Sequence, residues 1–350
     1  RPMGSSKTVV IKGLSIGGGS PLRVESMIKT PLSDIYGCAE ECTALAAEGC
    51  ELIRVSLPDL SLAPNMKVLN ERSPVPLMAD IHFNHRLALA ALGSGCASIR
   101  INPGNMSDKK GTEEVIRLAR DMKAVIRIGA NGGSLSRAQM QKSGGDRAAA
   151  LACAVEEQLR ILLDNSFEDI IISAKSSSVT ETVRANSILS QKFPFPLHIG
   201  ITEAGSGIPG AVKGAAGISL MLAQGIGDTI RVSLTGPSTD EVRVGYSILR
   251  ALEIRHKGCS IISCPTCGRR RIDVVRLVEE VTSLLPKEIK DGTVIAVMGC
   301  EVNGPREAAG ADLGIAGTPD GFVLFRKGVP VCNDTAENLR KRLIEEIGRL

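Results

Sequence analysis

Aromatic residues are scarce in this sequence, which contains no tryptophan, two tyrosines and six phenylalanines among 350 residues. Proteins that bind single-stranded nucleic acids stack the bases against aromatic rings, so this composition argues against that function. A strong excess of positive charge is also absent, because the formal net charge is only +4. A general polyanion binder would carry a larger excess. We therefore expect no nucleic-acid partner, and any basic patch should be local.

The sequence also lacks long hydrophobic runs. No apolar stretch approaches the ~18 residues of a membrane helix, and no secretory signal is visible at the start. The ten cysteines are dispersed through a chain that is 43% hydrophobic, whereas a small disulfide-stabilised domain concentrates them. These features predict a cytoplasmic protein with reduced cysteines and no membrane segment. We assign no structural role to Arg1–Ser6.

A repeated pattern organises residues 21–256, after an N-terminal extension of residues 1–20. Short runs rich in aliphatic and β-branched residues alternate with segments of helical periodicity, which is typical of parallel strands covered on both faces. Eight such units predict an α/β fold, the (β/α)8 TIM barrel. A doubly wound open sheet is the alternative, but no G-x-G-x-x-G motif opens a helix. The predicted strands are 22–26, 51–56, 76–82, 98–102, 125–129, 169–175, 197–202 and 228–234, and the predicted helices include 38–48, 86–92, 112–122, 147–163, 179–191, 211–224 and 239–252.

Polar residues stand at the carboxyl ends of these predicted strands, where TIM-barrel active sites form. Five of the strand ends are basic, and arginine and lysine together with amides suit a small dianion or a diphosphate. A single strand-end charge is often merely solvated, but five on one rim favour a binding site. The candidate residues are Arg54, Asp80, His82, Arg100, Asn102, Arg127, Asn131, Lys175, Glu203, Arg231 and Ser233.

Residues 257–350 predict a second, smaller α/β domain with a metal site. Cys264 and Cys267 form a C-x2-C motif, Cys300 follows 33 residues later, and Glu307 follows seven residues after that. Three thiolates and one carboxylate suit an iron–sulfur cluster better than structural zinc. A zinc ribbon is the alternative, although it needs a second C-x2-C motif. We predict helices at 272–285 and 335–350 and strands at 293–298 and 322–325.

Taken together, these motifs resemble those of the 4-hydroxy-3-methylbut-2-enyl diphosphate synthase family. They run in order across nearly the whole chain, and the combination is highly specific. The matching stretches are Ala79-Asp80-Ile81-His82-Phe83, Ile99-Arg100-Ile101-Asn102-Pro103-Gly104-Asn105, Arg127-Ile128-Gly129, Thr202-Glu203-Ala204-Gly205, Gly225-Ile226-Gly227-Asp228-Thr229-Ile230-Arg231-Val232-Ser233-Leu234, Ser263-Cys264-Pro265-Thr266-Cys267-Gly268-Arg269 and Gly299-Cys300.

The resemblance implies a TIM barrel followed by an iron–sulfur domain related to that of sulfite reductases. It implies a [4Fe-4S] cluster whose ligands are Cys264, Cys267, Cys300 and Glu307, with Glu307 an exchangeable ligand that also has a catalytic role. The implied reaction is the two-electron reductive opening of 2-C-methyl-D-erythritol 2,4-cyclodiphosphate, with loss of water and with ferredoxin or flavodoxin as electron donor. It also implies a homodimer in which the cluster domain of one subunit caps the barrel mouth of the other.

The site residues take their expected roles from this reaction. The basic rim residues would bind the diphosphate, and Glu203 would donate a proton or stabilise charge at the reacting carbon. Two rival functions explain part of the pattern: another iron–sulfur reductase of a small phosphorylated substrate, and a non-catalytic phosphate-binding barrel with a zinc knuckle.

The chain departs from the family at three places, one of which is the end of the sixth strand, where Ser173-Ala174-Lys175-Ser176-Ser177-Ser178 keeps the lysine but changes its neighbours. The family's Asn-Gly-Pro-Gly-Glu loop reads Asn303-Gly304-Pro305-Arg306-Glu307, and a positive φ at Arg306 would cost roughly 1 kcal/mol. The stretch Val24-Glu25-Ser26-Met27-Ile28-Lys29-Thr30 differs from the family's more common glutamine, threonine and asparagine positions.

Overall fold

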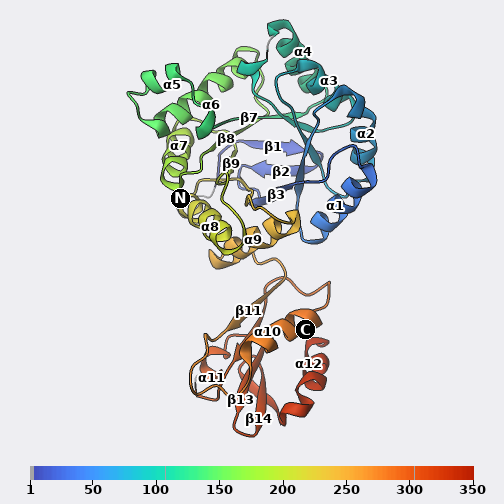
Figure 1. The fold of residues 1–350 in the computed structure, drawn as a ribbon, viewed down its shortest axis with the longest axis vertical. Coiled ribbons are helices and arrows are strands. Elements are labelled where there is room, and N and C mark those ends of the chain that lie inside the picture. The colour runs from blue at the N-terminus through green and yellow to red at the C-terminus, as the bar shows by residue number, and fades with distance from the viewer. Residues whose placement is uncertain (1–3, 107, 303) are drawn as a thin grey trace. The chain divides into compact units, whose positions relative to one another are not determined.

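The computed structural model describes residues 4–106, 108–302 and 304–350, which divide into two units, Arg1–Ile254 and Arg255–Leu350 (Figure 1). In the first unit eight parallel strands close into a barrel in the order β10-β3-β4-β5-β6-β7-β8-β9, which confirms the predicted TIM barrel. The strands are buried almost throughout, as expected for a sheet covered on both faces. Their bounds are β3 Arg23–Met27, β4 Leu52–Ser56, β5 Leu77–Asp80, β6 Ser98–Arg100, β7 Val125–Asn131, β8 Ile170–Lys175, β9 Leu197–Ile199 and β10 Thr229–Ile230.

Helices form a ring around the barrel (Figure 1). Their inward faces pack on the strands in one continuous aliphatic core. Helices α2 and α5 were not among the predicted segments; α5 has only six residues, and α2 has proline in its first turn. The bounds are α1 Ile35–Ala47, α2 Ala63–Arg72, α3 His85–Gly93, α4 Lys109–Asp121, α5 Arg137–Lys142, α6 Arg147–Asp164, α7 Val179–Lys192, α8 Gly207–Ala223 and α9 Ser238–Ala251, with 3-10 turns at Leu60–Leu62, Pro103–Asn105 and Gly132–Ser134.

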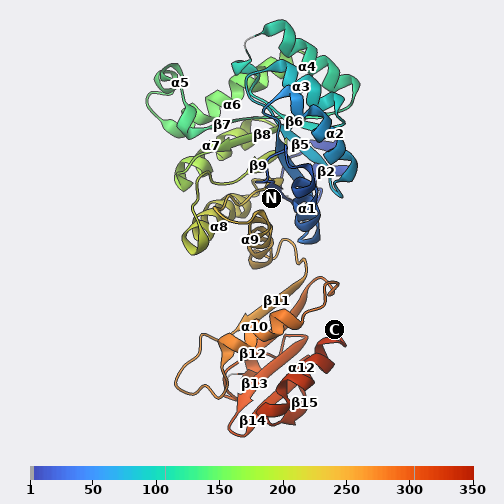
Figure 2. The same ribbon diagram turned by 45° about the vertical axis from the view of Figure 1, so that its right-hand side comes forward.

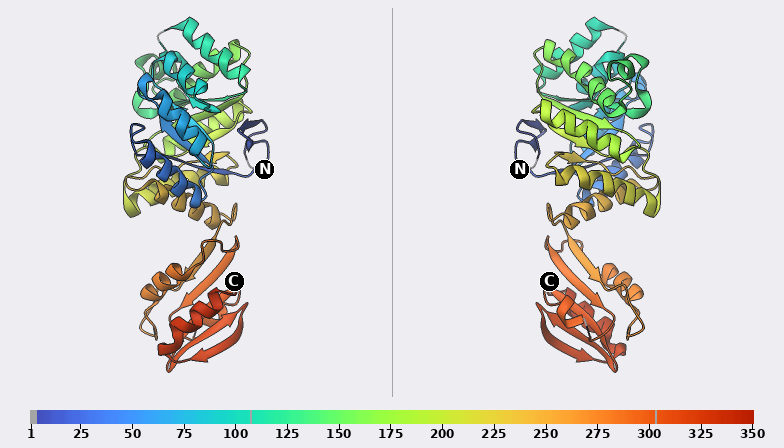
Figure 3. Two further views of the ribbon diagram at one scale, coloured as in Figure 1. Left: turned by 90° about the vertical axis from the view of Figure 1, so that its right-hand side faces the viewer. Right: turned by 90° about the vertical axis from the view of Figure 1, so that its left-hand side faces the viewer.

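An antiparallel hairpin, β1 (Thr8–Ile11) and β2 (Leu14–Gly17), covers one end of the barrel (Figure 3). The side chains of Val9, Ile11 and Ile16 are buried against residues at the starts of four barrel strands, which are Leu52, Met78, Val125 and Ile171. The hairpin therefore closes the end opposite the carboxyl rim, where the candidate site lies.

Residues before the hairpin are also anchored. The backbone nitrogen of Ser5 donates to the Asp228 carboxylate at 2.9 Å, and that of Gly4 donates to the Gly225 carbonyl at 3.1 Å. The expectation that Arg1–Ser6 has no structural role is therefore wrong for Gly4 and Ser5. Residues 1–3 lie outside the described part of the chain.

The second unit is a five-stranded sheet in the order β11-β12-β13-β14-β15 (Figure 2). Helices α10 and α12 cover one face with leucine, valine and isoleucine side chains, and the segment around α11 covers part of the other. The predicted strand 293–298 is confirmed, whereas β11, β13 and β15 were not predicted and α12 begins later than residue 335. The bounds are β11 Cys259–Ser263, α10 Val274–Leu284, β12 Thr293–Met298, α11 Gly304–Glu307, β13 Leu313–Thr318, β14 Gly321–Arg326, β15 Val329–Asp334, a 3-10 turn at Ala336–Asn338 and α12 Leu339–Ile347. Among the described residues, no helix combines the length and apolarity needed to cross a membrane.

Candidate active site

A cavity of about 220 Å³ opens at the carboxyl ends of the barrel strands. It is lined by every residue predicted for diphosphate binding except Asn102. The side chain of Asn102 instead accepts a hydrogen bond from the Gly104 backbone at 3.0 Å and caps the following 3-10 turn. The lining residues are Arg54, Asp80, His82, Arg100, Arg127, Gly129, Ala130, Asn131, Ser173, Lys175, Thr202, Arg231 and Ser233.

Asp80 holds two of the cavity arginines. One of its oxygens lies 3.3 Å from Arg100 and the other 3.7 Å from Arg54, and the ring of His82 also lies 3.7 Å away. Burial opposes ionisation of this carboxyl, but the two arginines outweigh it and lower the pKa of Asp80. Burial and the neighbouring Arg127 lower the pKa of Arg54 to about 9, so its guanidinium stays charged at neutral pH.

A second carboxylate, Glu25, lies inside the barrel and pairs with Arg127 at 3.0 Å. The Nδ1 atom of His198 lies 2.5 Å from the same carboxylate, and its Nε2 atom has no hydrogen-bond partner among the described residues. Burial opposes ionisation of Glu25, but the contacts with His198 and Arg127 hold the pKa of Glu25 well below its ordinary value. Burial also lowers the pKa of His198, so we assign a neutral ring that donates from Nδ1.

Lys175, at the end of β8, is the cavity cation for which no carboxylate partner is recorded among the described residues. Its side chain is buried, with 6% of the residue exposed, and the structure records no hydrogen bond or ion pair for it within the described residues. Burial and the neighbouring Arg54 and Arg127 lower the pKa of Lys175 well below its ordinary value. An anionic ligand would supply the charge that this ammonium group lacks.

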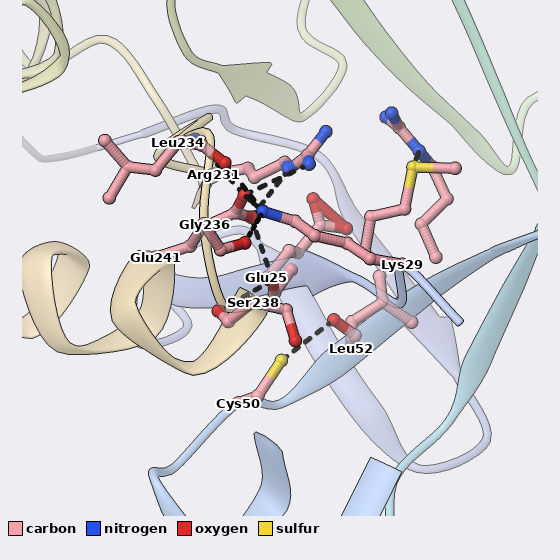
Figure 4. A network of polar contacts seen from close by, with 12 residues as sticks. Glu25, Lys29, Cys50, Leu52, Arg231, Leu234, Gly236, Ser238 and Glu241 are labelled. Carbon is pink, nitrogen blue, oxygen red and sulfur yellow. Dashed lines mark hydrogen bonds and ion pairs between the residues drawn. The ribbon is translucent and has the colours of Figure 1, made fainter. Parts of the chain in front are cut away.

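Arg231 is oriented by Glu241, the fully buried glutamate in the first turn of α9 (Figure 4). Its Nε and Nη2 atoms donate to the two carboxylate oxygens at 3.0 and 3.3 Å, which leaves Nη1 for a ligand. Five cationic side chains therefore line the cavity, and three carboxylates, those of Asp80, Glu25 and Glu241, contact them. The remaining positive charge suits a small polyanion.

Glu203 lies in the loop after β9, is exposed, and does not line the cavity, although its neighbour Thr202 does. Within the described chain, no ion pair of Glu203 with Arg231 or Lys175 is recorded. Its φ of +53° lies in the left-handed region, which costs a non-glycine residue of the order of 1 kcal/mol.

Glu25 and Glu241 escaped prediction because they lie within a strand and a helix, and nothing local marks them as partners of the rim arginines.

The second unit contains a larger cavity, of about 590 Å³, at the carboxyl ends of the adjacent parallel strands β11 and β12. All four predicted ligands line it. Cys264 and Cys267 follow β11, Cys300 follows β12, and Glu307 ends α11. Asn303, in the same loop, lies outside the described residues.

Backbone contacts hold the two loops of this cavity together. The Gly299 nitrogen donates to the Cys264 sulfur at 3.2 Å, and the Cys264 nitrogen donates to the Val297 carbonyl at 3.2 Å. A side chain at Gly299 would begin 3.4 Å from that sulfur, so glycine leaves it accessible. Between the first two cysteines, Thr266 has a φ of +67°, which is rare for a β-branched residue.

The donor set fits an iron–sulfur cluster. Among the described residues, no three histidine, cysteine, aspartate or glutamate side chains converge closely enough for a single metal ion. A multinuclear cluster takes one ligand for each iron, so its ligands surround a volume and need not meet at a point. Three cysteines and one glutamate around one cavity meet this requirement.

Arg306 does not impose the backbone strain that its place in the loop suggested. It lies within the short helix α11 and is not among the described residues with positive φ. Its side chain is exposed, so it adds a cation beside Glu307 without a conformational cost.

Comparisons with known proteins cover both units. The GcpE TIM-barrel domain matches residues 6–246, and the GcpE protein C-terminal domain matches residues 260–349. Similar proteins named 4-hydroxy-3-methylbut-2-en-1-yl diphosphate synthase (flavodoxin) include one from Lawsonia intracellularis, 45% identical over 92% of this chain and 90% of that protein. Another, from Geobacter sulfurreducens, is 43% identical over 99% of this chain and 98% of that protein.

Among solved structures, the dihydropteroate synthase of Yersinia pestis matches 71% of this chain and 100% of its own, with a TM-score of 0.51 and 13% identity. That of Vibrio fischeri matches 71% and 98%, with a TM-score of 0.50 and 12% identity. At these identities the likeness shows the fold alone. The two family matches and the full-length relatives show that the chain belongs to the GcpE family.

Proposed function

We propose that this chain is an oxidoreductase that opens 2-C-methyl-D-erythritol 2,4-cyclodiphosphate to 4-hydroxy-3-methylbut-2-enyl diphosphate, in the non-mevalonate route to isoprenoids. Its full-length relatives carry the name of this activity. The observation that carries the proposal is the pairing of two cavities in one chain. One is cationic and sized for a small anion, and the other is lined by three cysteines and a glutamate.

The barrel residues bind and orient the substrate in this proposal. Arg54 and Arg100 are held by Asp80, and Arg127 is held by Glu25, so their free N–H groups are already placed for phosphate oxygens. The ammonium group of Lys175 gains its counter-charge from the diphosphate. His82, Asn131 and Ser233 complete the cavity wall and supply further hydrogen-bonding groups.

The proton needed when water leaves comes from Glu203 in this proposal. Its loop follows β9 at the carboxyl rim, next to the cavity residue Thr202. A carboxyl group can deliver a proton only when it reaches the leaving oxygen, so the role requires the Glu203 side chain to approach the bound substrate. The Glu203→Gln variant, which should bind substrate but turn it over at least a hundredfold more slowly, tests this role.

Cys264, Cys267, Cys300 and Glu307 would hold a [4Fe-4S] cluster, which supplies the two electrons when bound. A carboxylate is a weaker ligand for iron than a thiolate, so Glu307 is the ligand that can exchange. Flavodoxin, which the relatives' names print, is the electron donor we propose, with ferredoxin as the alternative. Cys264, Cys267 and Cys300 are free thiols, and we expect the protein to work in the reducing cytoplasm.

An anaerobic assay tests the proposal. Protein purified without oxygen should be brown and carry iron and sulfide, and it should form the allylic diphosphate from the cyclic diphosphate with reduced flavodoxin. A colourless protein with one zinc and no product would overturn the proposal. A brown protein that binds the cyclic diphosphate without converting it would favour a different iron–sulfur reductase.

We also propose a homodimer in which the cluster domain of one subunit serves the barrel of the other. The family resemblance supports this arrangement, and mixed subunits test it. A Cys264→Ser chain and a Lys175→Met chain, each inactive alone, should together recover part of the activity, because one interface then contains an intact barrel and an intact cluster domain. No recovery in a verified mixed dimer would refute the shared site.

A further inference from the structure

The buried carboxylate of Glu241 is the centre of a polar network at the carboxyl end of the barrel (Figure 4). Its Oε1 atom accepts hydrogen bonds from Ser26 Oγ at 2.9 Å and from Arg231 Nε at 3.0 Å. Its Oε2 atom accepts from the Leu234 backbone at 3.2 Å and lies 3.1 Å from Lys29 Nζ. One glutamate therefore contacts residues of both the first and the last barrel strand or the loops that follow them.

Lys29, in the loop after β3, ties this network together. Its Nζ atom donates to the carbonyl oxygens of Leu234 at 2.6 Å and Gly236 at 2.5 Å, in the loop between β10 and α9. Its backbone nitrogen donates to both oxygens of the Glu41 carboxylate on α1, at 2.6 and 3.0 Å. Because both its backbone and its side chain are held, Lys29 fixes one loop against the other.

The β10–α9 loop contains the cavity residues that depend on this contact. Leu234 follows Ser233 directly, its N–H is held by Glu241, and its C=O is held by Lys29. The peptide groups on both sides of Leu234 are therefore fixed. Lys29 and Arg231 also share the Glu241 carboxylate, so loss of the lysine would remove one of the groups that hold the Glu241 Oε2 atom in place.

The same loop supports the segment that carries Glu203. The Thr235 backbone nitrogen donates to the Gly205 carbonyl at 3.0 Å, and Thr235 forms a parallel bridge with Ser206. A displacement of the β10–α9 loop would therefore also reach the loop after β9.

We propose that Lys29 is a positioning residue, which clasps the β10–α9 loop so that Arg231 and Ser233 keep the geometry that binds a diphosphate. This inference rests on the proposed function, because it assumes that these two residues contact the substrate. Lys29 is not itself among the residues that line the cavity. Its side chain is 36% exposed, and partly exposed ion pairs contribute little to folding stability, so its main effect is local.

Steady-state kinetics with the cluster-loaded enzyme test this role. The Lys29→Met variant should raise KM for the cyclic diphosphate on the order of ten- to a hundredfold, because small misplacements of binding groups cost this much. Its kcat should change less than its KM, because the β10–α9 loop carries Arg231 and Ser233 itself and reaches the Glu203 segment only through Thr235. Lys29→Arg should restore most of the affinity, since a guanidinium can donate to the same two carbonyl oxygens.

The matched control is Lys7→Met. Lys7 also forms an ion pair, with Glu168 at 2.8 Å, and its side chain is 33% exposed, but it lies just before the hairpin that covers the opposite end of the barrel. This variant should leave KM unchanged. A Lys29→Met enzyme with wild-type KM would overturn the inference, as would a loss of thermal stability that accounts for its weaker binding.

A third variant separates failure of the inference from failure of the proposed function. Arg231→Met should raise KM at least as much as Lys29→Met. If Arg231→Met leaves KM unchanged, the proposed substrate site is wrong. If only Arg231→Met raises it, the site stands and the clasp is refuted.

Discussion

The carboxylate of Glu25 accepts two hydrogen bonds from one nitrogen of Arg127, at 3.0 and 3.3 Å, in the interior of the barrel. Both side chains are at least 95% buried. Removing one partner of a buried ion pair leaves an uncompensated charge, which costs about 3–5 kcal/mol. The Glu25→Ala variant should lose about this much free energy of unfolding in denaturant titrations.

An exposed carboxylate provides the control for this prediction. Glu168→Ala removes the partner of Lys7, which is a surface pair, and should change the free energy of unfolding by less than about 1 kcal/mol. Equal losses in Glu25→Ala and Glu168→Ala would show that the buried pair with Arg127 contributes no more to the free energy of unfolding than a surface pair.

The same pair predicts how stability depends on pH. The folded-state pKa of Glu25 lies well below its unfolded value, so the unfolded chain binds more protons in acid. The contribution of Glu25 is therefore fully present above about pH 4.5, the ordinary range of glutamate, and is lost as the pH falls below it. Unfolding midpoints measured from pH 7 to pH 3 should fall less steeply in Glu25→Gln than in the wild type, and identical slopes would contradict this.

Lys175 should show opposite effects on stability and on binding. Burial and the neighbouring arginines disfavour its ammonium form, so Lys175→Met should raise the free energy of unfolding by about 1 kcal/mol or more. The same change should raise KM or abolish turnover, because the diphosphate loses a cation. In the wild type, affinity should fall as the pH rises through the lowered pKa of Lys175, and the variant should lack this step. A variant that is both less stable and fully active would refute this account.

The cluster ligands can be tested by metal content. Serine variants of Cys264, Cys267 and Cys300 should each lose most of their iron and sulfide, because serine replaces a soft thiolate with a hard oxygen. Cys332→Ser is the control, since Cys332 belongs to the same unit but does not line the cavity. Iron content should remain at the wild-type level in that variant, and equal loss in all four would indicate a general folding defect.

Thr266 offers a test of backbone strain between the first two cysteines. Its positive φ is unfavourable for a β-branched residue, whereas asparagine tolerates this region. Thr266→Asn should therefore stabilise the cluster-free protein by about 1 kcal/mol and keep its capacity for iron. Thr266→Pro should prevent cluster assembly, because proline locks φ near −65°. A proline variant that takes up normal iron would show that this turn is not required.

The N-terminal hairpin should contribute strongly to stability despite its position outside the barrel sheet. Ile11 is fully buried against the starts of the barrel strands, whereas its neighbour Val10 is 51% exposed. Ile11→Ala should cost about 2–5 kcal/mol in thermal or denaturant unfolding, and Val10→Ala less than about 0.5 kcal/mol. Similar small effects from both would mean that the hairpin does not pack as described.

Local sequence patterns determined the architecture and the chemistry. The eight barrel strands could be located because a buried parallel strand is almost continuously aliphatic, as in Ile170–Lys175. Cys264 and Cys267 could be predicted as ligands because two cysteines separated by two residues are themselves typical of a metal-binding turn. Strand β13 was missed because Leu313–Thr318 contains two glycines and an alanine, and β15 because its side chains are mostly exposed.

Tertiary structure alone decided how the cavity cations are held. Glu25 meets Arg127 across 102 positions of sequence, and Glu241 meets Ser26 across 215. No local period marks such partners, because only the closed barrel brings them together. The φ of Arg306 and the anchoring of Ser5 on Asp228 were settled in the same way. Short-range periodicity determines which elements form, whereas the pairing of buried charges depends on contacts between residues distant in the chain.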